Sequence, residues 1–107
     1  MLNKKNYKIA LQFKEQLLKV TPLIDFRVFG SRARGRKYGR FSDMDVFIEV
    51  EKLDKDLEAK INDITFELTY ETDVFISPLI FTKDEIENSP LRVSPIVRNI
   101  FEEGIKV

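Results

Sequence analysis

The sequence predicts an α/β (α+β) domain in which helices flank a small mixed three-stranded sheet. Two segments repeat apolar residues every three or four positions, as amphipathic helices do, and three shorter segments are extended or alternate apolar and polar residues, as strands do. The chain has 107 residues, of which 43% are hydrophobic. This length and composition suit one globular core and are too apolar for a disordered chain. We therefore expect a single domain over residues 1–107.

The N-terminal part predicts a helix followed by a strand. Its helical stripe consists of Ile9, Ala10, Phe13, Leu17 and Val20. Thr21-Pro22 is expected to end the helix, because the residue before a proline is disfavoured in the helical conformation. Residues 23–29 alternate with period two and predict the first strand. Gly30-Ser31 is expected to close that strand and to open the connection to the next one, which is a loop or a short helix.

The remainder predicts two more strands and three more helices. Residues 42–50 alternate and predict the second strand, and an apolar stripe over residues 53–68 predicts the longest helix. Residues 72–81 are predicted to be extended, with Asp73 at their start. The last two helices have start and stop signals: a capping box at Thr82–Glu85, an N-cap and first-turn proline at Ser94-Pro95, and a stop at Gly104.

The lengths of the connections predict the strand directions. A short connection between the first and second strands favours an antiparallel pair, and the long helix after the second strand permits a parallel crossover. The sheet should therefore be mixed.

Composition restricts the chemistry. The chain has no His and no Cys, which excludes the usual general base, a thiol nucleophile, a disulfide framework and a thiolate zinc site. The 18 basic and 18 acidic residues are segregated, since residues 26–42 contain six positive charges and no acid, whereas residues 43–73 contain eleven acids and three lysines. Neither a signal peptide nor a membrane-spanning stretch is visible, so we expect a cytoplasmic protein with no membrane partner.

Three carboxylates are candidates for a metal site. Asp43 and Asp45 are two apart on a predicted strand, so both side chains leave the same face, and Asp73 is expected to join them from the neighbouring strand. Aspartate is depleted in strands, and adjacent like charges repel. Oxygen ligands of this kind suit Mg²⁺, and two such ions can assist phosphoryl or nucleotidyl transfer. An isolated Asp-x-Asp pair is more often structural than metal-binding.

A candidate phosphate-binding segment precedes these carboxylates. Gly30 and Ser31 directly follow a predicted strand, where backbone amides and a hydroxyl can meet phosphate oxygens. Arg32 and Arg34 can add positive charge and planar donors. Each feature alone is more often an ordinary turn or a solvated basic loop. Their occurrence within sixteen residues of the two aspartates favours a nucleotide with Mg²⁺ as the ligand.

The run Gly30-Ser31-Arg32-Ala33-Arg34-Gly35, followed by Ser42-Asp43-Met44-Asp45, resembles the signature of the minimal nucleotidyltransferases (MNT) of the DNA polymerase β-like superfamily. Asp73-Val74 resembles the family's third carboxylate strand, and residues 100–105 resemble its closing helix. The resemblance implies the polymerase β-like nucleotidyltransferase fold.

The resemblance also implies a role for each matching residue. Gly30 and Ser31 would hold the β- and γ-phosphates of a nucleoside triphosphate, expected to be ATP, with the help of Arg32. The metal ligands and catalytic residues would be Asp43, Asp45 and Asp73, which together would bind two Mg²⁺ ions. An acceptor hydroxyl would attack the α-phosphate and release pyrophosphate.

The small size of the chain leaves little surface for a template or primer, so the acceptor hydroxyl is expected to belong to a partner macromolecule. The resemblance implies that this partner is a HEPN-domain protein from a neighbouring gene, that the transferred group is AMP and that this chain is the antitoxin. Two alternatives stay open. One is a catalytically silent module that neutralises a HEPN-type partner by masking it. The other is a nucleic-acid patch, which we rank last because few aromatic residues accompany its basic ones: Arg27, Arg32, Arg34, Arg36, Lys37 and Arg40.

Overall fold

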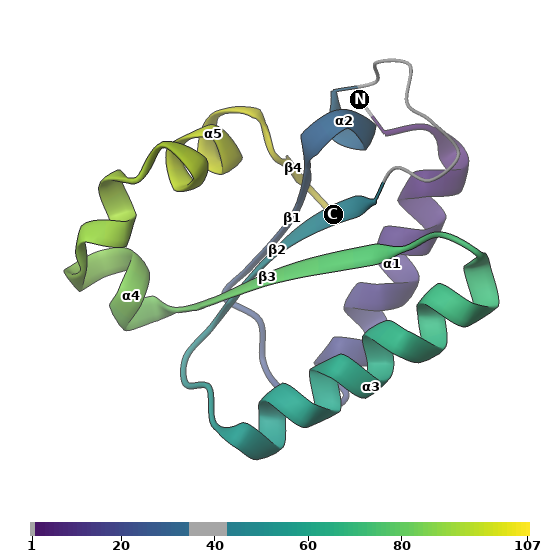
Figure 1. The fold of residues 1–107 in the computed structure, drawn as a ribbon, viewed down its shortest axis with the longest axis horizontal. Helices are drawn as coiled ribbons and strands as arrows, with labels where there is room; N and C mark the ends of the chain where they lie inside the picture. Colours follow the sequence, from purple (N-terminus) through teal and green to yellow (C-terminus); the bar gives the residue numbers. More distant parts are fainter. Residues whose placement is uncertain (1, 35–42) are drawn as a thin grey trace.

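The computed structural model describes residues 2–34 and 43–107 (Figure 1). The elements are, in order, α1 Lys4–Leu18, β1 Asp25–Phe29, α2 Gly30–Ala33, β2 Met44–Val50, α3 Lys55–Thr72, β3 Ile76–Thr82, α4 Lys83–Asn88, a 3₁₀ turn at Pro90–Val93, α5 Pro95–Glu103 and β4 Ile105–Lys106. The predicted mixed α+β architecture is confirmed. No helix in the described part of the chain is long and apolar enough to cross a membrane.

The sheet has the strand order β3-β2-β1-β4. β1 pairs with β2 in the antiparallel direction, and β2 pairs with β3 in the parallel direction, as the connection lengths predict. The fourth strand, β4, is a difference from the expected three: it adds two residues beside Arg27 and Val28. A two-residue strand is too short to give a periodic pattern, so sequence alternation cannot reveal it.

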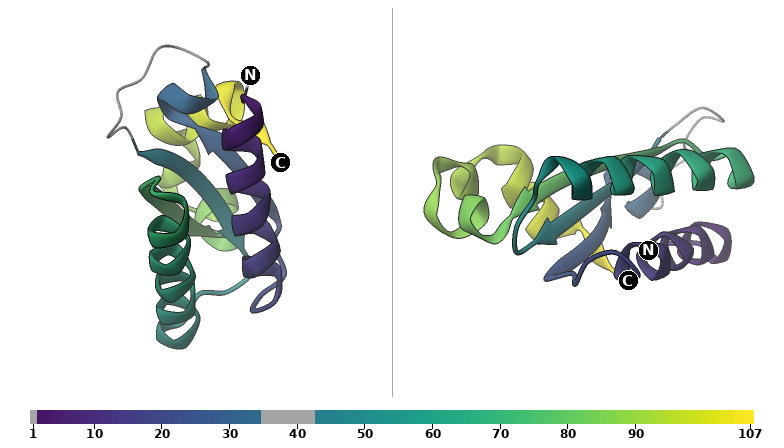
Figure 2. Two further views of the ribbon diagram at one scale, coloured as in Figure 1. Left: turned by 90° about the vertical axis from the view of Figure 1, so that its right-hand side faces the viewer. Right: turned by 90° about the horizontal axis from the view of Figure 1, so that it is seen from below.

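Two groups of helices cover the sheet. α1 and α3 lie side by side, and α4 and α5 gather away from them (Figures 1 and 2). One face of the sheet packs in the main core with α1 and α3, which includes Phe13, Val28 and Val46. The smaller second core, on the other face, consists of Phe47, Phe81, Val97 and Ile100. The side chains of β2 are therefore buried on both faces through most of its length.

The strand predicted over residues 72–81 begins later than expected. α3 continues to Thr72, and Asp73 is its C-cap, with φ 57° and ψ 23°. Thr69 accounts for this extension, because its carbonyl accepts from Asp73 N–H and its hydroxyl accepts from Ile76 N–H at 3.2 Å. Aspartate is one of the few residue types that tolerate the left-handed conformation. The expectation that Asp73 starts a strand is therefore wrong.

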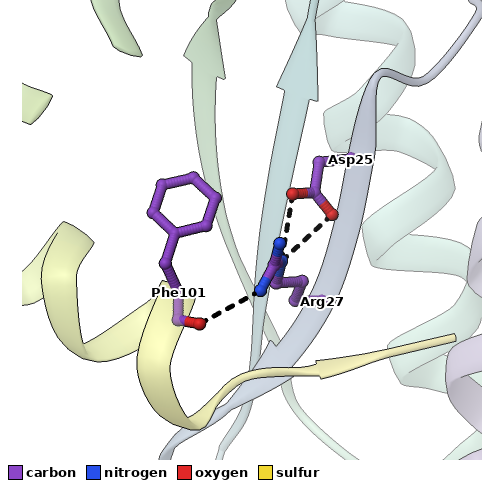
Figure 3. A network of polar contacts seen from close by, with 3 residues as sticks. All are labelled: Asp25, Arg27 and Phe101. Carbon is purple, nitrogen blue, oxygen red and sulfur yellow. Dashed lines mark hydrogen bonds and ion pairs between the residues drawn. The ribbon is translucent and has the colours of Figure 1, made fainter.

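Arg27 joins α5 to the sheet (Figure 3). Its Nε donates to both carboxylate oxygens of Asp25, at 3.0 and 3.1 Å, and Nη1 donates to the Phe101 carbonyl at 3.3 Å. The guanidinium carbon also lies 4.7 Å from the centre of the Phe101 ring, a distance suited to a cation–π interaction. These contacts fix the end of α5 over the second core.

Glu49 is a buried carboxylate on the same face, with 6% of its surface exposed. Burial raises its pKa, the carboxylates of Asp25 and Glu87 raise it further, and Lys83 and Arg27 oppose them. The fold thus disfavours the ionised form of Glu49, which lowers the free energy of unfolding at neutral pH. This loss of stability disappears once the side chain is protonated in both the folded and unfolded states.

We therefore expect Glu49→Gln to raise the free energy of unfolding at pH 7. The gain should shrink as the pH falls and should vanish below the ordinary Glu value of 4.5. Urea denaturation of both proteins between pH 3.5 and 7.5 measures it. If the difference in the free energy of unfolding were constant across this pH range, ionisation of Glu49 would not be its cause.

Candidate functional site

Gly30 lies directly beside the side chain of Asp45. Asp45 pairs with Phe29 across β1 and β2, which places its side chain beside the next residue, Gly30. A Cβ atom at Gly30 would lie 3.2 Å from Asp45 Cγ and would overlap its Oδ2. Gly30 also has φ +79°, a conformation that L side chains rarely adopt. Glycine is thus required here both for the turn and for the close approach of the carboxylate.

Asp43, which directly precedes β2, acts electrostatically on Asp45 within that strand. Asp45 is half-buried and Asp43 is exposed. Burial raises the pKa of Asp45, the charge of Asp43 raises it further, and Arg34 lowers it. The effect of the Asp43 charge on Asp45 is what two neighbouring carboxylates produce, and their joint role in binding metal stays a prediction. Two neighbouring carboxylates form a donor set that fits a hard divalent cation.

The Gly30-Ser31 segment is the start of helix α2, so the short helix is the one of the two expected alternatives that forms here. Ser31 is half-buried, so its hydroxyl lies near the surface next to the residue that contacts Asp45. The four-residue helix ends at Arg34, whose N–H donates to the Gly30 carbonyl at 3.1 Å. Residues 35–42 of the predicted basic loop lie outside the described residues.

Arg32 points away from solvent. Only 5% of its surface is exposed, and Nη1 donates to Asn6 Oδ1 at 2.8 Å. Asn6 is itself 1% exposed and belongs to α1. The structure therefore places Arg32 where it ties α2 to α1, and a direct contact of Arg32 with phosphate stays a prediction.

Arg32→Ala is expected to lower the free energy of unfolding by about 2 kcal/mol or more, because it removes a charged donor from a buried amide oxygen and leaves a cavity. Urea denaturation measures the loss. The matched control is Arg34→Ala, which should change the stability by less than about 0.5 kcal/mol because its ion pair with Glu103 is exposed. Equal stabilities of the two variants would contradict the structural role of Arg32.

Arg34 is the exposed arginine of this segment. It lies 3.7 Å from Glu103 at the end of α5, and 42% of its side chain is accessible. Its charge also lowers the pKa of Asp45, which places it within electrostatic range of the aspartate pair. The side chain is thus available to a ligand bound beside Asp45.

Asp73 does not join the other two carboxylates. It caps α3 two residues before Phe75, whose carbonyl accepts from Met44 N–H at 2.8 Å. Within residues 2–34 and 43–107, no group of three or more acidic side chains lies close enough to share a metal ion. A role of Asp73 as a metal ligand or proton acceptor stays a prediction.

The parallel register of β2 and β3 places Ser77 opposite Asp45, so that both side chains leave the same face of the sheet. Ser77 is half-buried. Sequence analysis did not single it out, because its proximity to Asp45 depends on a register that is set by the crossover helix. It is an additional polar group at this edge of the site.

The basic residues do not form one continuous patch among the described residues. Arg27 is bound to Asp25, and Arg32 is buried against Asn6. Arg34 is exposed, and Arg36, Lys37 and Arg40 lie outside the described residues. These internal contacts of Arg27 and Arg32 speak against the nucleic-acid alternative.

Comparisons with known proteins identify the fold. Residues 7–107 match the family model of the nucleotidyltransferase domain. A toxin–antitoxin complex, MntA-HpeT in mutant form, contains a chain that is 17% identical, with a TM-score of 0.59, over 98% of this chain and 72% of that one. A toxin–antitoxin complex with AMP-PNP matches at 18% identity and a TM-score of 0.57, over 89% and 69% of the two chains. No curated protein sequence matches the chain.

A third similar structure is a tri-AMPylated HEPN toxin from Shewanella oneidensis in complex with MNT antitoxin, at 15% identity and a TM-score of 0.57, over 94% of this chain and 70% of that one. At these identities the structural matches establish the fold, while the family model covers nearly the whole sequence. The structural matches and the family model agree with the resemblance seen in residues 30–45. The chain therefore belongs to the family of nucleotidyltransferase domains.

Proposed function

We propose that this protein is a Mg²⁺-dependent nucleotidyltransferase that moves AMP from ATP onto a hydroxyl of a partner macromolecule. The partner is a HEPN-domain protein encoded by a neighbouring gene, and this chain is its antitoxin. The proposal extends family membership by analogy with two neighbours: one is a toxin–antitoxin complex with AMP-PNP, and the other contains an AMPylated HEPN toxin.

The single observation that supports it most is the contact between Gly30 and Asp45. It brings the segment proposed to bind phosphate against the carboxylates proposed to bind metal, although the two are fifteen residues apart in the chain. Ser31 follows Gly30, and Arg34 lies within electrostatic range of Asp45. The site therefore combines a hydroxyl, an exposed cation and two carboxylates at one edge of the sheet.

Each group has a proposed role in the transfer. Gly30 and Ser31 hold the β- and γ-phosphates, and Arg34 contributes positive charge to the triphosphate. The acceptor hydroxyl gives up its proton, for which Asp73 is the proposed acceptor, as its oxygen bonds to the α-phosphorus. The bond between that phosphorus and the bridging oxygen to the β-phosphate breaks, so pyrophosphate leaves. No histidine or cysteine is needed for these roles.

The donor set fits the metal that this chemistry uses. Asp43 and Asp45 would hold Mg²⁺, whose charge would oppose the effects of burial and of the Asp43 charge that raise the pKa of Asp45. When bound, Mg²⁺ supplies positive charge to the phosphate oxygens and to the developing charge of the leaving group.

Labelled ATP tests the proposal. The protein is incubated with the HEPN-domain partner and Mg²⁺, using ATP labelled either at the α-phosphate or at the γ-phosphate. We expect the α-label to become attached to the partner and the γ-label to leave with pyrophosphate. EDTA should abolish both the labelling of the partner and the release of labelled pyrophosphate. Absence of α-label on a partner that forms a complex with the protein would overturn the proposal.

A second candidate function is masking of the HEPN-type partner by a catalytically silent module. It is favoured by one observation, the position of Asp73 at the end of α3, away from the aspartate pair. Masking requires no transfer, so it predicts that partner neutralisation in cells survives replacement of both Asp43 and Asp45.

A further inference from the structure

The outer surface of α3 bears aromatic side chains that the core does not use. Phe66 is 79% exposed and Tyr70 is 90% exposed, one helical turn apart. Phe75, which follows α3 in the chain, is 64% exposed. Single exposed apolar residues are common, but three aromatic side chains on one edge of a small domain form a cluster of the kind that marks an interaction site.

A groove connects this helix with the neighbouring strand. Its volume is about 220 Å³, and it is lined by Asn62, Thr65, Phe66, Thr69, Phe75 and Pro78, together with the buried Ile76. β3 stands at the end of the strand order, so the groove runs along the edge of the sheet. We call these lining residues and Tyr70 the α3–β3 surface.

The segment of the chain that carries the α3–β3 surface is negatively charged. Residues 61–82 contain four acids and no Lys or Arg. Asp63 and Glu67 are exposed and lie within one turn of Phe66, and Asp73 follows Tyr70 by three positions. A negatively charged rim repels nucleic acids and anionic membranes, whereas it attracts a cationic protein surface.

The edge of the sheet also restricts how a partner can bind. Pro78 lies within β3 and lacks an N–H, which disfavours the addition of another strand at this edge. An apolar groove between side chains of a helix and a strand instead suits the apolar face of an amphipathic helix.

The α3–β3 surface continues toward the candidate site. The Phe75 carbonyl accepts from Met44 N–H, and Met44 lies between Asp43 and Asp45. A partner bound over Phe75 is therefore one strand away from the carboxylates that the proposed reaction uses.

We propose that the α3–β3 surface is the docking site for the acceptor protein, which binds through an amphipathic helix with an apolar face flanked by Lys and Arg. This inference rests on the proposed function for the identity of the partner. It adds which face of this chain the partner covers and what chemistry that face recognises.

The test measures binding of the HEPN-domain protein from the neighbouring gene by calorimetry without nucleotide. Phe66→Ala/Tyr70→Ala should weaken binding at least about 10-fold, because exposed aromatic side chains dominate many interfaces. The matched control, Val93→Ala/Ile96→Ala, removes exposed apolar side chains outside the α3–β3 surface and should change the affinity by less than about twofold.

Charge reversal tests whether the acidic residues around the α3–β3 surface attract the partner. Asp63→Lys/Glu67→Lys should weaken binding and reduce its dependence on salt. The matched control, Glu15→Lys/Glu102→Lys, changes the net charge by the same amount at exposed positions on α1 and α5. It should leave the affinity and its dependence on salt nearly unchanged. All replaced side chains are exposed, so thermal melting should show folded proteins in every case.

The outcomes separate this proposal from the proposed function. If wild type binds through this surface but transfers no AMP, the docking site stands and the proposed function fails. Transfer of AMP with equal kcat/KM by wild type and the aromatic variant would overturn the docking site alone. The docking site would also be overturned if the wild-type protein did not bind the partner. The same holds if the wild-type protein formed a homodimer and the Phe66→Ala/Tyr70→Ala variant were monomeric.

Discussion

The Asp43→Asn/Asp45→Asn variant is expected to lose AMP transfer by a factor of at least about 1,000, which corresponds to about 4 kcal/mol in the activation free energy. Neutral amides cannot supply the negative charge that holds a hard divalent cation beside the phosphates. Stability should not fall, because burial and mutual repulsion already disfavour the ionised form of Asp45. Initial rates with α-labelled ATP and urea denaturation measure the two effects separately.

Glu15→Gln/Glu102→Gln is the control for this variant. It removes the same number of negative charges from exposed positions on α1 and α5, so it should retain transfer. Equal rates for the wild type and the double Asn variant would exclude catalysis through these carboxylates. If the double Asn variant loses transfer but still neutralises the partner in cells, then transfer is not the means of neutralisation.

The parts of the fold that the sequence predicts well are those that local patterns determine. The alternation over residues 42–50 locates β2, and the capping box at Thr82 and Glu85 is present as predicted, with reciprocal side-chain contacts. Predictions of this kind need no knowledge of distant contacts.

The parts that were missed depend on contacts between distant segments. The burial of Arg32 is set by Asn6, 26 residues earlier, and nothing in the run from Gly30 to Gly35 distinguishes it from the exposed Arg34. The end of α3 is set by the hydrogen bonds of Thr69, whereas the apolar stripe fades before it. A local pattern therefore cannot tell a buried member of a run from an exposed one when a distant residue decides which is buried.

Gly30→Ala is expected to disrupt both the fold and the site. A left-handed backbone costs a non-glycine residue about 1–2 kcal/mol, and the new Cβ must displace the Asp45 carboxylate, an overpacking that costs about 1–3 kcal/mol. Movement of Asp45 should also lower AMP transfer at least about 100-fold, because small displacements of positioned groups have effects of this size. Urea denaturation and initial rates measure the two consequences.

A double-mutant cycle separates the two causes of the Gly30→Ala effect. Asp45→Ala keeps only a Cβ atom, which would lie 3.5 Å from the new methyl group, an ordinary van der Waals contact. In the Asp45→Ala background, Gly30→Ala should therefore cost only the backbone term, about 1–2 kcal/mol. Ser31→Ala, the neighbouring control, should leave stability nearly unchanged. If Gly30→Ala costs the same with and without the Asp45 carboxylate, the two groups are not in contact, and the observation that best supports the proposed function is lost.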